Sequence, residues 1–512
     1  MATWILGEKP DPALLLAAAR GRILDLRLGR EAAARVRAAR RTVEAILGTG
    51  RPVYGVNTGF GALARERIGA ADLGHLQRNL LLSHATGTGP DLAPEEKRLA
   101  LLLRIQSLCR GHSGVRLEVV RWLLRLYASG WLPRVPEQGS VGACGDLAPL
   151  AHLALPILGE GTLISPEGKE MPARRALRRL GLEPLDLEAK EGLALINGVQ
   201  VSHAVGLCAW ARMRNLSISA DVAGALSVEA LLGSHRPFDA RVARTRPHRG
   251  AVLTAANLRR LLRRSEVARS HRDCDRVQDP YSFRCMPQVH GAAKDALAVL
   301  ETALLREAEG ATDNPLVFPD RGDTVSAGNF HGQPLALPLD YAALAVTSWG
   351  NISERRTATL IHPAMSGLPA FLTPEPGLNS GLMIPQVVAA SLASENKGLA
   401  HPASADTIPT SADQEDHVSM AMGAARKLRR AAGNLERILA VEFLTAAQAR
   451  EFARDLRAGA GAQAAWECLR EQVPPLQGDR FLEPELATVT ELVRGGVLAA
   501  AAEAAAGPLR AC

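Results

Sequence analysis

A chain of 512 residues with 47% hydrophobic and 22% charged residues can bury a large core, and this composition is typical of a soluble globular protein. Its formal net charge of +7 does not indicate nucleic-acid binding, because aromatic residues make up only 4% of the chain and do not alternate with the basic runs. Those runs, at 241–250, 258–273 and 425–430, are interpreted as solvated helix faces.

The sequence contains neither a membrane span nor a recognisable secretion signal. No stretch of about 18 uncharged apolar residues occurs, and Glu8 and Asp11 stand where a signal peptide would be basic and then apolar. We therefore expect a cytoplasmic protein without membrane contact. The seven cysteines are scattered and form no CxxC pair, so we expect no disulfide framework, no zinc cluster and no other metal site.

Helical periodicity dominates the chain. At 30–47 the apolar residues Val36, Ala39, Val43 and Ile46 share one face, and Gly48 follows them. The same period predicts further helices at 95–109, 115–129, 294–310, 351–361, 415–439 and 492–507. Alternating stretches are few, and the best hairpin candidate is 157–173 with its SPEG turn.

These elements predict a mainly α protein, with a long central helical bundle and a loop-rich N-terminal part that carries a small β-hairpin. The loop content falls near residue 210, which predicts an N-terminal domain over 1–210 and a helical C-terminal domain over 211–512. Bundle cores are common sites of catalysis.

The loop GSVGACGDLAPLAH, residues 139–152, places a cysteine among glycines at every third position. It allows two interpretations. Cys144 could be a small buried hydrophobe in a strand-to-helix turn. Alternatively, the amide nitrogen of Gly145 could attack the carbonyl carbon of Ala143, since neither residue has a bulky side chain to obstruct the approach. Loss of water and then of hydrogen sulfide from Cys144 would leave a five-membered imidazolone with an exocyclic methylidene, which is a strong electrophile.

Several other polar, glycine-rich stretches interrupt the helices, and long ordered loops tend to carry function. Two of the four tyrosines, Tyr54 and Tyr281, lie in them. Each candidate residue also has a structural interpretation. Tyr54 and Tyr281 could be core or interface residues, His84 a core histidine, Arg284 half of an ion pair, and Glu415 with Asp416 the acidic N-terminus of a helix. The stretches are 54–64, 82–89, 197–200, 277–291, 311–318, 327–334, 377–386 and 410–419.

Taken together, these loops resemble those of the aromatic amino-acid ammonia-lyases, in which an Ala-Ser-Gly segment cyclises to methylidene-imidazolone (MIO). The resemblance extends over nearly the whole chain, from YGVNTGFG at 54–61 to TSADQEDHVSMA at 410–421. Ser83-His84 and Gln414-Glu415 are similar to the pairs found in the members that act on histidine.

The resemblance implies elimination of ammonia from L-histidine to give trans-urocanate, the first step of histidine degradation. It implies an MIO group formed from Ala143, Cys144 and Gly145 and no dissociable cofactor. It also implies a homotetramer whose active sites take residues from three subunits, with small molecules rather than nucleic acid or membrane as ligands.

The resemblance also assigns roles to single residues. Tyr54 would remove the β-proton, and a phenol with an ordinary pKa near 10 must then be shifted downward or act as a hydrogen-bonded phenolate. Arg284 would grip the substrate carboxylate. The remaining assignments are Tyr281 assisting proton transfer, His84 and Glu415 holding the imidazole, Gln278 alongside the substrate, and Asn197 and Phe330 supporting the MIO ring.

Two residues depart from the family pattern: Cys144 replaces the usual serine, and Val199 stands where threonine is frequent. Three alternatives stay open. The chain could be a phenylalanine or tyrosine ammonia-lyase or an aminomutase on the same fold. It could be a thiol enzyme with Cys144 as nucleophile, or a non-catalytic helical scaffold in which Cys144 stays unmodified.

Overall fold

The computed structural model describes residues 2–271 and 276–512, so Cys274 and the end of the basic run at 272–273 lie outside the described residues. The chain divides into two compact units. Unit 1 comprises 1–208, 301–339 and 402–426, and unit 2 comprises 209–300, 340–401 and 427–512. Because each unit gathers separate stretches, the boundary expected near residue 210 stays a prediction.

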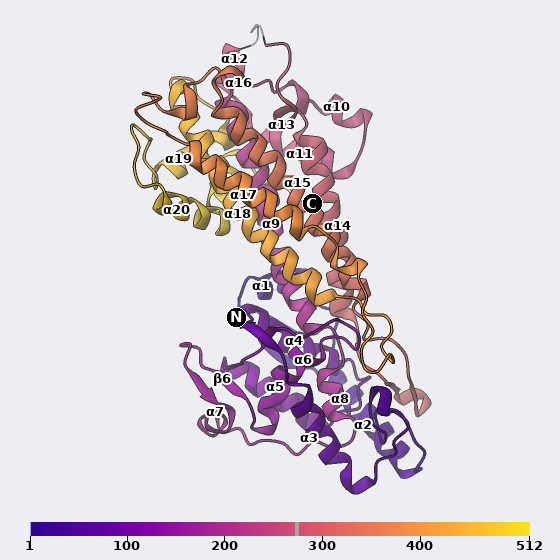
Figure 1. Ribbon diagram of the computed structural model, residues 1–512. Helices are drawn as coiled ribbons and strands as arrows, with labels where there is room; N and C mark the ends of the chain where they lie inside the picture. Colours follow the sequence, from indigo (N-terminus) through magenta and orange to yellow (C-terminus); the bar gives the residue numbers. More distant parts are fainter. Residues whose placement is uncertain (1, 272–275) are drawn as a thin grey trace. The chain divides into compact units, whose positions relative to one another are not determined.

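Helices predominate in both units, which confirms the predicted mainly α class (Figure 1). The longest contribute residues to both units: α9 (Gln200–Ala230), α14 (Met286–Glu309), α15 (Gln333–Leu360) and α18 (Ala421–Arg450). Unit 2 adds α10 (Ala240–Thr245), α11 (Arg249–Leu261), α12 (Glu266–Ser270), α13 (Tyr281–Arg284), α16 (Pro363–Ser366), α17 (Met383–Leu399), α19 (Ala460–Arg470), α20 (Glu483–Arg494) and α21 (Val497–Ala506).

Unit 2 has a bundle core. Ala389 of α17 packs against Ile438 and Val441 of α18, with Leu486 of α20 beside them. Every helix in the described residues falls short of the length or the apolar content that a bilayer crossing requires.

In its described residues, unit 1 holds the small sheets and eight shorter α-helices. The helices are α1 (Pro12–Ala19), α2 (Arg30–Gly48), α3 (Leu73–His84), α4 (Pro94–Cys109), α5 (Leu117–Ser129), α6 (Leu147–Ala154), α7 (Ala173–Leu180) and α8 (Glu191–Ile196). Strand β1 (Thr3–Leu6) pairs in parallel with β2 (Asp25–Leu28). The antiparallel groups are β3 (Thr88–Asp91) with β5 (Pro136–Gln138), β4 (Leu132–Pro133) with β6 (Thr162–Ile164) and β7 (Glu170–Pro172), and β8 (Leu316–Phe318) with β9 (Asp323–Val325).

The predicted hairpin at 157–173 is confirmed by β6 and β7, which are joined by a turn in which Gly168 N donates to Ser165 O over 2.9 Å. The helices expected at 30–47, 95–109 and 115–129 are confirmed as α2, α4 and α5. Helix α5 ends at Gly130, whose φ of 74° is left-handed, a conformation common for glycine after a helix.

Four expected helix boundaries are wrong. The helix expected at 294–310 is the C-terminal part of α14, which begins at Met286. The helix expected at 351–361 is the end of α15, and the one expected at 492–507 is broken at Gly496 into α20 and α21. The helix expected from 415 begins instead at Ala421, so Glu415 and Asp416 do not open it. Three left-handed residues before Glu415, with φ of 54° at Ser411, 51° at Ala412 and 64° at Asp413, form a turn that is incompatible with helix.

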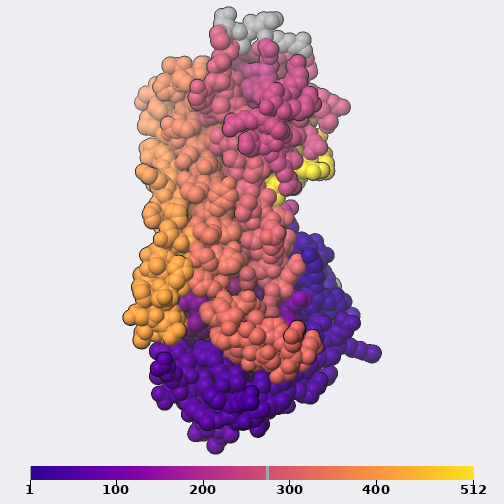
Figure 2. Space-filling view, turned by 90° about the vertical axis from the view of Figure 1, so that its right-hand side faces the viewer, coloured from indigo at the N-terminus to yellow at the C-terminus, as the bar shows by residue number. Residues whose placement is uncertain are grey.

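The 301–339 segment packs on the N-terminal stretch of unit 1. Val317 of β8 joins Ala39 and Val43 of α2 and Val56 in one buried cluster. In Figure 2 the coral part of the chain near residue 320 lies directly on indigo N-terminal residues. Unit 1 is thus built from three stretches far apart in sequence, and this brings the glycine-rich loops together.

Candidate active site

The loop 139–146 follows β5 and leads into α6, and two of its glycines are required by close contacts. Gly142 and Gly145 have left-handed φ angles of 70° and 76°. A Cβ at Gly145 would lie 2.1 Å from the carbonyl oxygen of Gly198, and one at Gly142 would lie 2.2 Å from Ser419 Oγ. No other residue fits these positions without moving its neighbours.

Main-chain contacts within unit 1 hold the loop in place. Met420 N donates to Val141 O over 2.8 Å, and Ser419 Oγ donates to Gly142 O over 3.0 Å. Asp146 N donates to Gly198 O over 2.7 Å. The loop is therefore anchored on both sides of Cys144.

Asp146 is a further residue of the site that sequence reasoning missed. Its buried carboxylate accepts hydrogen bonds from Ser140 Oγ at 2.9 Å, Ser202 N at 2.7 Å and Ser202 Oγ at 2.6 Å, which ties the loop to the start of α9. Burial raises the pKa of Asp146, and these hydrogen bonds oppose the rise. An aspartate directly before an apolar helical run was the signal that could have found it.

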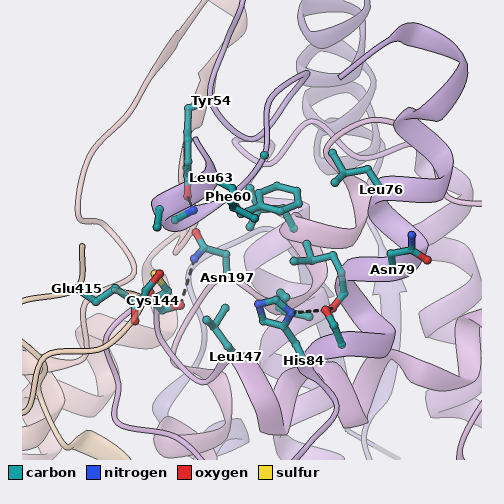
Figure 3. A pocket seen from close by; sticks show the side chains of 18 residues that line it. Tyr54, Phe60, Leu63, Leu76, Asn79, His84, Cys144, Leu147, Asn197 and Glu415 are labelled. Carbon is teal, nitrogen blue, oxygen red and sulfur yellow. Dashed lines mark hydrogen bonds between the residues drawn. The ribbon is translucent and has the colours of Figure 1, made fainter. Parts of the chain in front are cut away.

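A cavity of about 530 Å³ opens beside the loop (Figure 3). Five of the predicted site residues line it: Tyr54, His84, Cys144, Asn197 and Glu415. A second cavity of about 400 Å³ shares Tyr54, Cys144 and Glu415 with the first and adds Ala143 and Phe330. The structure therefore brings together seven predicted residues, and Gly145 adjoins them in the loop.

Cys144 is held by two hydrogen bonds at its two polar ends. Asn197 Nδ2 donates to the main-chain oxygen of Cys144 over 3.1 Å, and Cys144 Sγ donates to Glu415 Oε1 over 2.8 Å (Figure 3). The second oxygen of Glu415 accepts from Thr410 Oγ1 over 2.6 Å. Burial, and then the adjoining carboxylate, raise the pKa of the Cys144 thiol well above its ordinary value.

Asn197 follows α8 and is only 2% exposed. Its main-chain oxygen accepts from Arg104 Nη1 over 3.0 Å, and the same guanidinium nitrogen donates to Gln200 Oε1 over 2.9 Å. Burial lowers the pKa of Arg104 to about 10. Sequence reasoning missed Arg104, although a charge inside the apolar run of α4 was visible. Beside it the fully buried Lys190 and Asp313 form an ion pair with Nζ 2.9 Å from Oδ1.

Tyr54 and His84 lie on the wall of the larger cavity. The Tyr54 hydroxyl accepts a hydrogen bond from Gly61 N over 3.3 Å. Burial raises the pKa of Tyr54, opposed by this hydrogen bond, so the downward shift considered for a catalytic base is absent within this chain. His84 ends α3, and its Nδ1 lies 3.0 Å from Ser83 Oγ. Burial lowers the pKa of His84, which favours the neutral imidazole.

The structure does not bring Gln278, Tyr281 and Arg284 into either cavity, and all three belong to unit 2. The guanidinium carbon of Arg284 lies 4.4 Å from the centre of the Tyr281 ring, so these two residues form a cation–π contact. Tyr281 is 71% exposed. Arg284 Nε is buried without a hydrogen-bond partner among the described residues.

The residues around Cys144 fit the MIO ring that the family resemblance implies. Ala143 and Gly145 are the residues of least bulk at the two atoms that would join, and Asn197 Nδ2 already contacts the oxygen that would become the ring carbonyl. Asn197 Oδ1 is buried without a partner among the described residues. No cluster of three or more potential metal-binding His, Cys, Asp or Glu side chains occurs in the part of the chain that the structure describes.

Comparisons with known proteins agree with this geometry. Residues 11–471 match the family model described as aromatic amino acid lyase. A histidine ammonia-lyase from Sorangium cellulosum (strain So ce56) is 53% identical over 488 residues, which cover 94% of this chain and 95% of that protein. The crystal structure of histidine ammonia-lyase from Trypanosoma cruzi has a TM-score of 0.90 and 44% identity, with 98% of this chain and 95% of that chain covered.

A tyrosine aminomutase from Streptomyces globisporus has a TM-score of 0.91 at 35% identity, with 98% of each chain covered. The chain belongs to the aromatic amino acid lyase family. The predicted family resemblance and the class of carbon–nitrogen lyase are thereby confirmed.

Proposed function

We propose that this protein is an ammonia-lyase that converts L-histidine to trans-urocanate and ammonia. The observation that carries the proposal is that His84 and Glu415 share one cavity with the glycine-flanked Cys144 loop. A carboxylate can accept the N–H of an imidazole ring, and a neutral histidine can donate or accept a second hydrogen bond. A phenyl ring would offer neither group a hydrogen bond in this partly buried site, which penalises phenylalanine as the substrate.

We also propose that Ala143, Cys144 and Gly145 carry the MIO group in the mature protein. Its methylidene carbon supplies the electrophile that takes up the substrate amine. The chain's own contribution is positioning: Asn197 donates to the carbonyl oxygen of residue 144, which draws electrons from the adjoining carbons. Asp146 and the Gly198 carbonyl keep the loop from shifting.

Within this proposal Tyr54 takes the β-proton of the substrate. Its hydroxyl lies on the cavity wall shared with Cys144 and Glu415, so a bound amino acid lies within its reach. The β-carbon is only weakly acidic, and the base must therefore be well placed. Because its pKa is raised, Tyr54 acts as the small phenolate fraction present at neutral pH.

We assign Gln278, Tyr281 and Arg284 to a site completed by other copies of the chain, in a cytoplasmic homotetramer with three subunits at each active site. The exposed Tyr281 ring and the unpaired Nε of Arg284 support this assignment, since the pair has functional groups left for a ligand. Arg284 would hold the substrate carboxylate and Tyr281 would assist proton transfer. Phe330, which lines the second cavity together with Ala143 and Cys144, would support the MIO ring.

The alternative of a thiol enzyme is disfavoured by the charge around Cys144. A reactive thiolate needs a cation, a metal or a helix N-terminus that lowers its pKa, whereas the hydrogen-bond partner of Sγ is the Glu415 carboxylate. In a phenylalanine or tyrosine lyase the substrate ring would have no imidazole nitrogen for His84 and Glu415 to bind. An aminomutase would be recognised by its product, a β-amino acid.

Two measurements, product absorbance and intact mass, test the proposal together. Purified protein is offered L-histidine, L-phenylalanine and L-tyrosine, product absorbance is followed, and the intact mass is determined. We expect urocanate from histidine with much higher kcat/KM than either other product, and a mass lower than the sequence mass by one water and one hydrogen sulfide. Full activity from a protein of unreduced mass that still carries its sulfur at position 144 would refute the MIO assignment.

A further inference from the structure

The sulfur of Cys144 donates a hydrogen bond to the carboxyl group of Glu415, and Thr410 holds that carboxyl group in place. Glu415 Oε1 accepts from Sγ at 2.8 Å, while Oε2 accepts from Thr410 Oγ1 at 2.6 Å. The backbones of Thr410 and Glu415 are also paired, with N···O distances of 3.0 and 3.2 Å. Contacts within the chain itself therefore fix Glu415 toward Cys144, and a role limited to the substrate imidazole leaves this contact unexplained.

Ring closure and elimination are balanced as follows. Gly145 N bonds to the carbonyl carbon of Ala143, and one water leaves with that carbonyl's oxygen and the hydrogens of the Cys144 and Gly145 nitrogens. The Cα–H and Cβ–S bonds of residue 144 then break and a Cα=Cβ bond forms. The sulfur departs as hydrogen sulfide. It keeps its own hydrogen and takes up one further proton, which balances the proton released from Cα.

The position of Glu415 makes delivery of that further proton necessary. If the carboxyl stayed ionised, the sulfur would depart as an anion only 2.8 Å from a second negative charge, in a partly buried cavity where such repulsion is poorly screened. Tyr54 and His84 also bear electrostatically on Glu415 from the wall of the same cavity, but the hydrogen-bond partner of the sulfur is Glu415. Among the described residues Glu415 is the ionisable group that contacts the sulfur.

We propose that Glu415 matures the loop as well as binding the substrate: its carboxyl group takes up the proton lost from Cα of residue 144 and passes it to the departing sulfur. This inference rests on the proposed function, because it concerns the formation of the same MIO group. One side chain thus serves two successive steps, first toward Cys144 and later toward an imidazole that occupies the vacated space.

The test follows ring formation in newly synthesised full-length chain by intact mass and by the sulfide released, both independent of lyase activity. We expect Glu415→Gln to slow ring formation by about 10²-fold or more, as loss of a general acid–base group does. Cys144→Ser provides a diagnostic comparison. Hydroxide is a more basic leaving group than hydrosulfide, so its departure needs more proton transfer. Glu415→Gln should therefore slow ring formation by a larger factor in the Cys144→Ser variant than in the chain that retains Cys144.

His84→Asn is the matched control, because it removes the other proposed imidazole ligand without touching the sulfur. It should lower turnover and leave the rate of ring formation unchanged. If Glu415→Gln fails to fold, Thr410→Val releases the carboxyl from its anchor and should still slow ring formation. Ring formation in Glu415→Gln at the wild-type rate, or equal slowing with and without Cys144→Ser, overturns the inference. Either result leaves the proposed function intact wherever wild-type protein carries the ring and releases urocanate.

Discussion

Asn197 Nδ2 lies 3.1 Å from the main-chain oxygen of Cys144 and donates a hydrogen bond to it from a side chain that is 2% exposed. A donor fixed in a dry site stabilises negative charge that develops on the acceptor during reaction, because it needs no reorganisation at that moment. In the proposed mechanism this oxygen becomes conjugated with the carbon that the substrate amine attacks.

We predict that Asn197→Ala lowers kcat by about 10²–10³-fold with little change in KM, the loss typical of an oxyanion-hole donor. Urocanate absorbance over a range of histidine concentrations measures it. Asn79→Ala is the control, since Asn79 lines the same cavity without contacting Cys144. Equal losses from both variants would contradict a specific role for Asn197.

Gly145→Ala should abolish ring formation. The new Cβ would lie 2.1 Å from the Gly198 oxygen, and the left-handed backbone alone costs about 1–2 kcal/mol with any side chain present. Intact mass should show the unreduced chain, and thermal unfolding should show a lower Tm. Gly48→Ala is the matched control, because nothing lies within 4 Å of its Cβ position, and it should keep the ring. Ring formation in Gly145→Ala would show that the loop rearranges before it closes.

The buried pair of Lys190 and Asp313 should matter for stability far more than ion pairs at the surface. Asp313→Asn leaves the Lys190 ammonium buried without its counter-charge, and removal of one partner of such a pair costs about 3–5 kcal/mol. Denaturant unfolding measures the loss. Glu309→Gln breaks the exposed Lys9–Glu309 pair, whose side chains are 76% and 38% exposed, and should change the free energy of unfolding by less than about 1 kcal/mol. Equal effects would mean that water reaches Lys190.

The predictable parts of this fold are those whose signals are local. Helix α5 has a clear apolar face and a glycine stop, and the β6–β7 hairpin has its turn residues, so both follow from the sequence. The first half of α15 does not, because apolar residues on all faces and an internal Pro338 hide the helical period. The sequence predicts a helix at Glu415 because the three residues with positive φ before it have no signature in their side chains.

The site divides in the same way. Residue types in the loops indicated Tyr54, His84, Cys144, Asn197 and Glu415, and the structure places them around one cavity. Arg104 and Asp146 were missed because their role is to hold main-chain atoms, and such contacts depend on distant segments meeting. Gln278, Tyr281 and Arg284 stay predictions, since their proposed contacts involve other copies of the chain.

The last prediction concerns pH and follows from Tyr54. Burial raises the pKa of this phenol above its ordinary value of about 10, with the nearby Glu415 carboxylate adding to the rise. Below its pKa the phenolate fraction increases about tenfold for each pH unit, so kcat should rise with a slope near one from about pH 7 to about pH 9. His84 adds no opposing trend in that range, because its lowered pKa keeps it neutral there.

Initial rates at saturating histidine measure this pH profile, and Tyr54→Phe should lose both the slope and most of the activity. A flat profile in the wild-type protein would mean that Tyr54 works without ionising, and that the β-proton leaves to a different base.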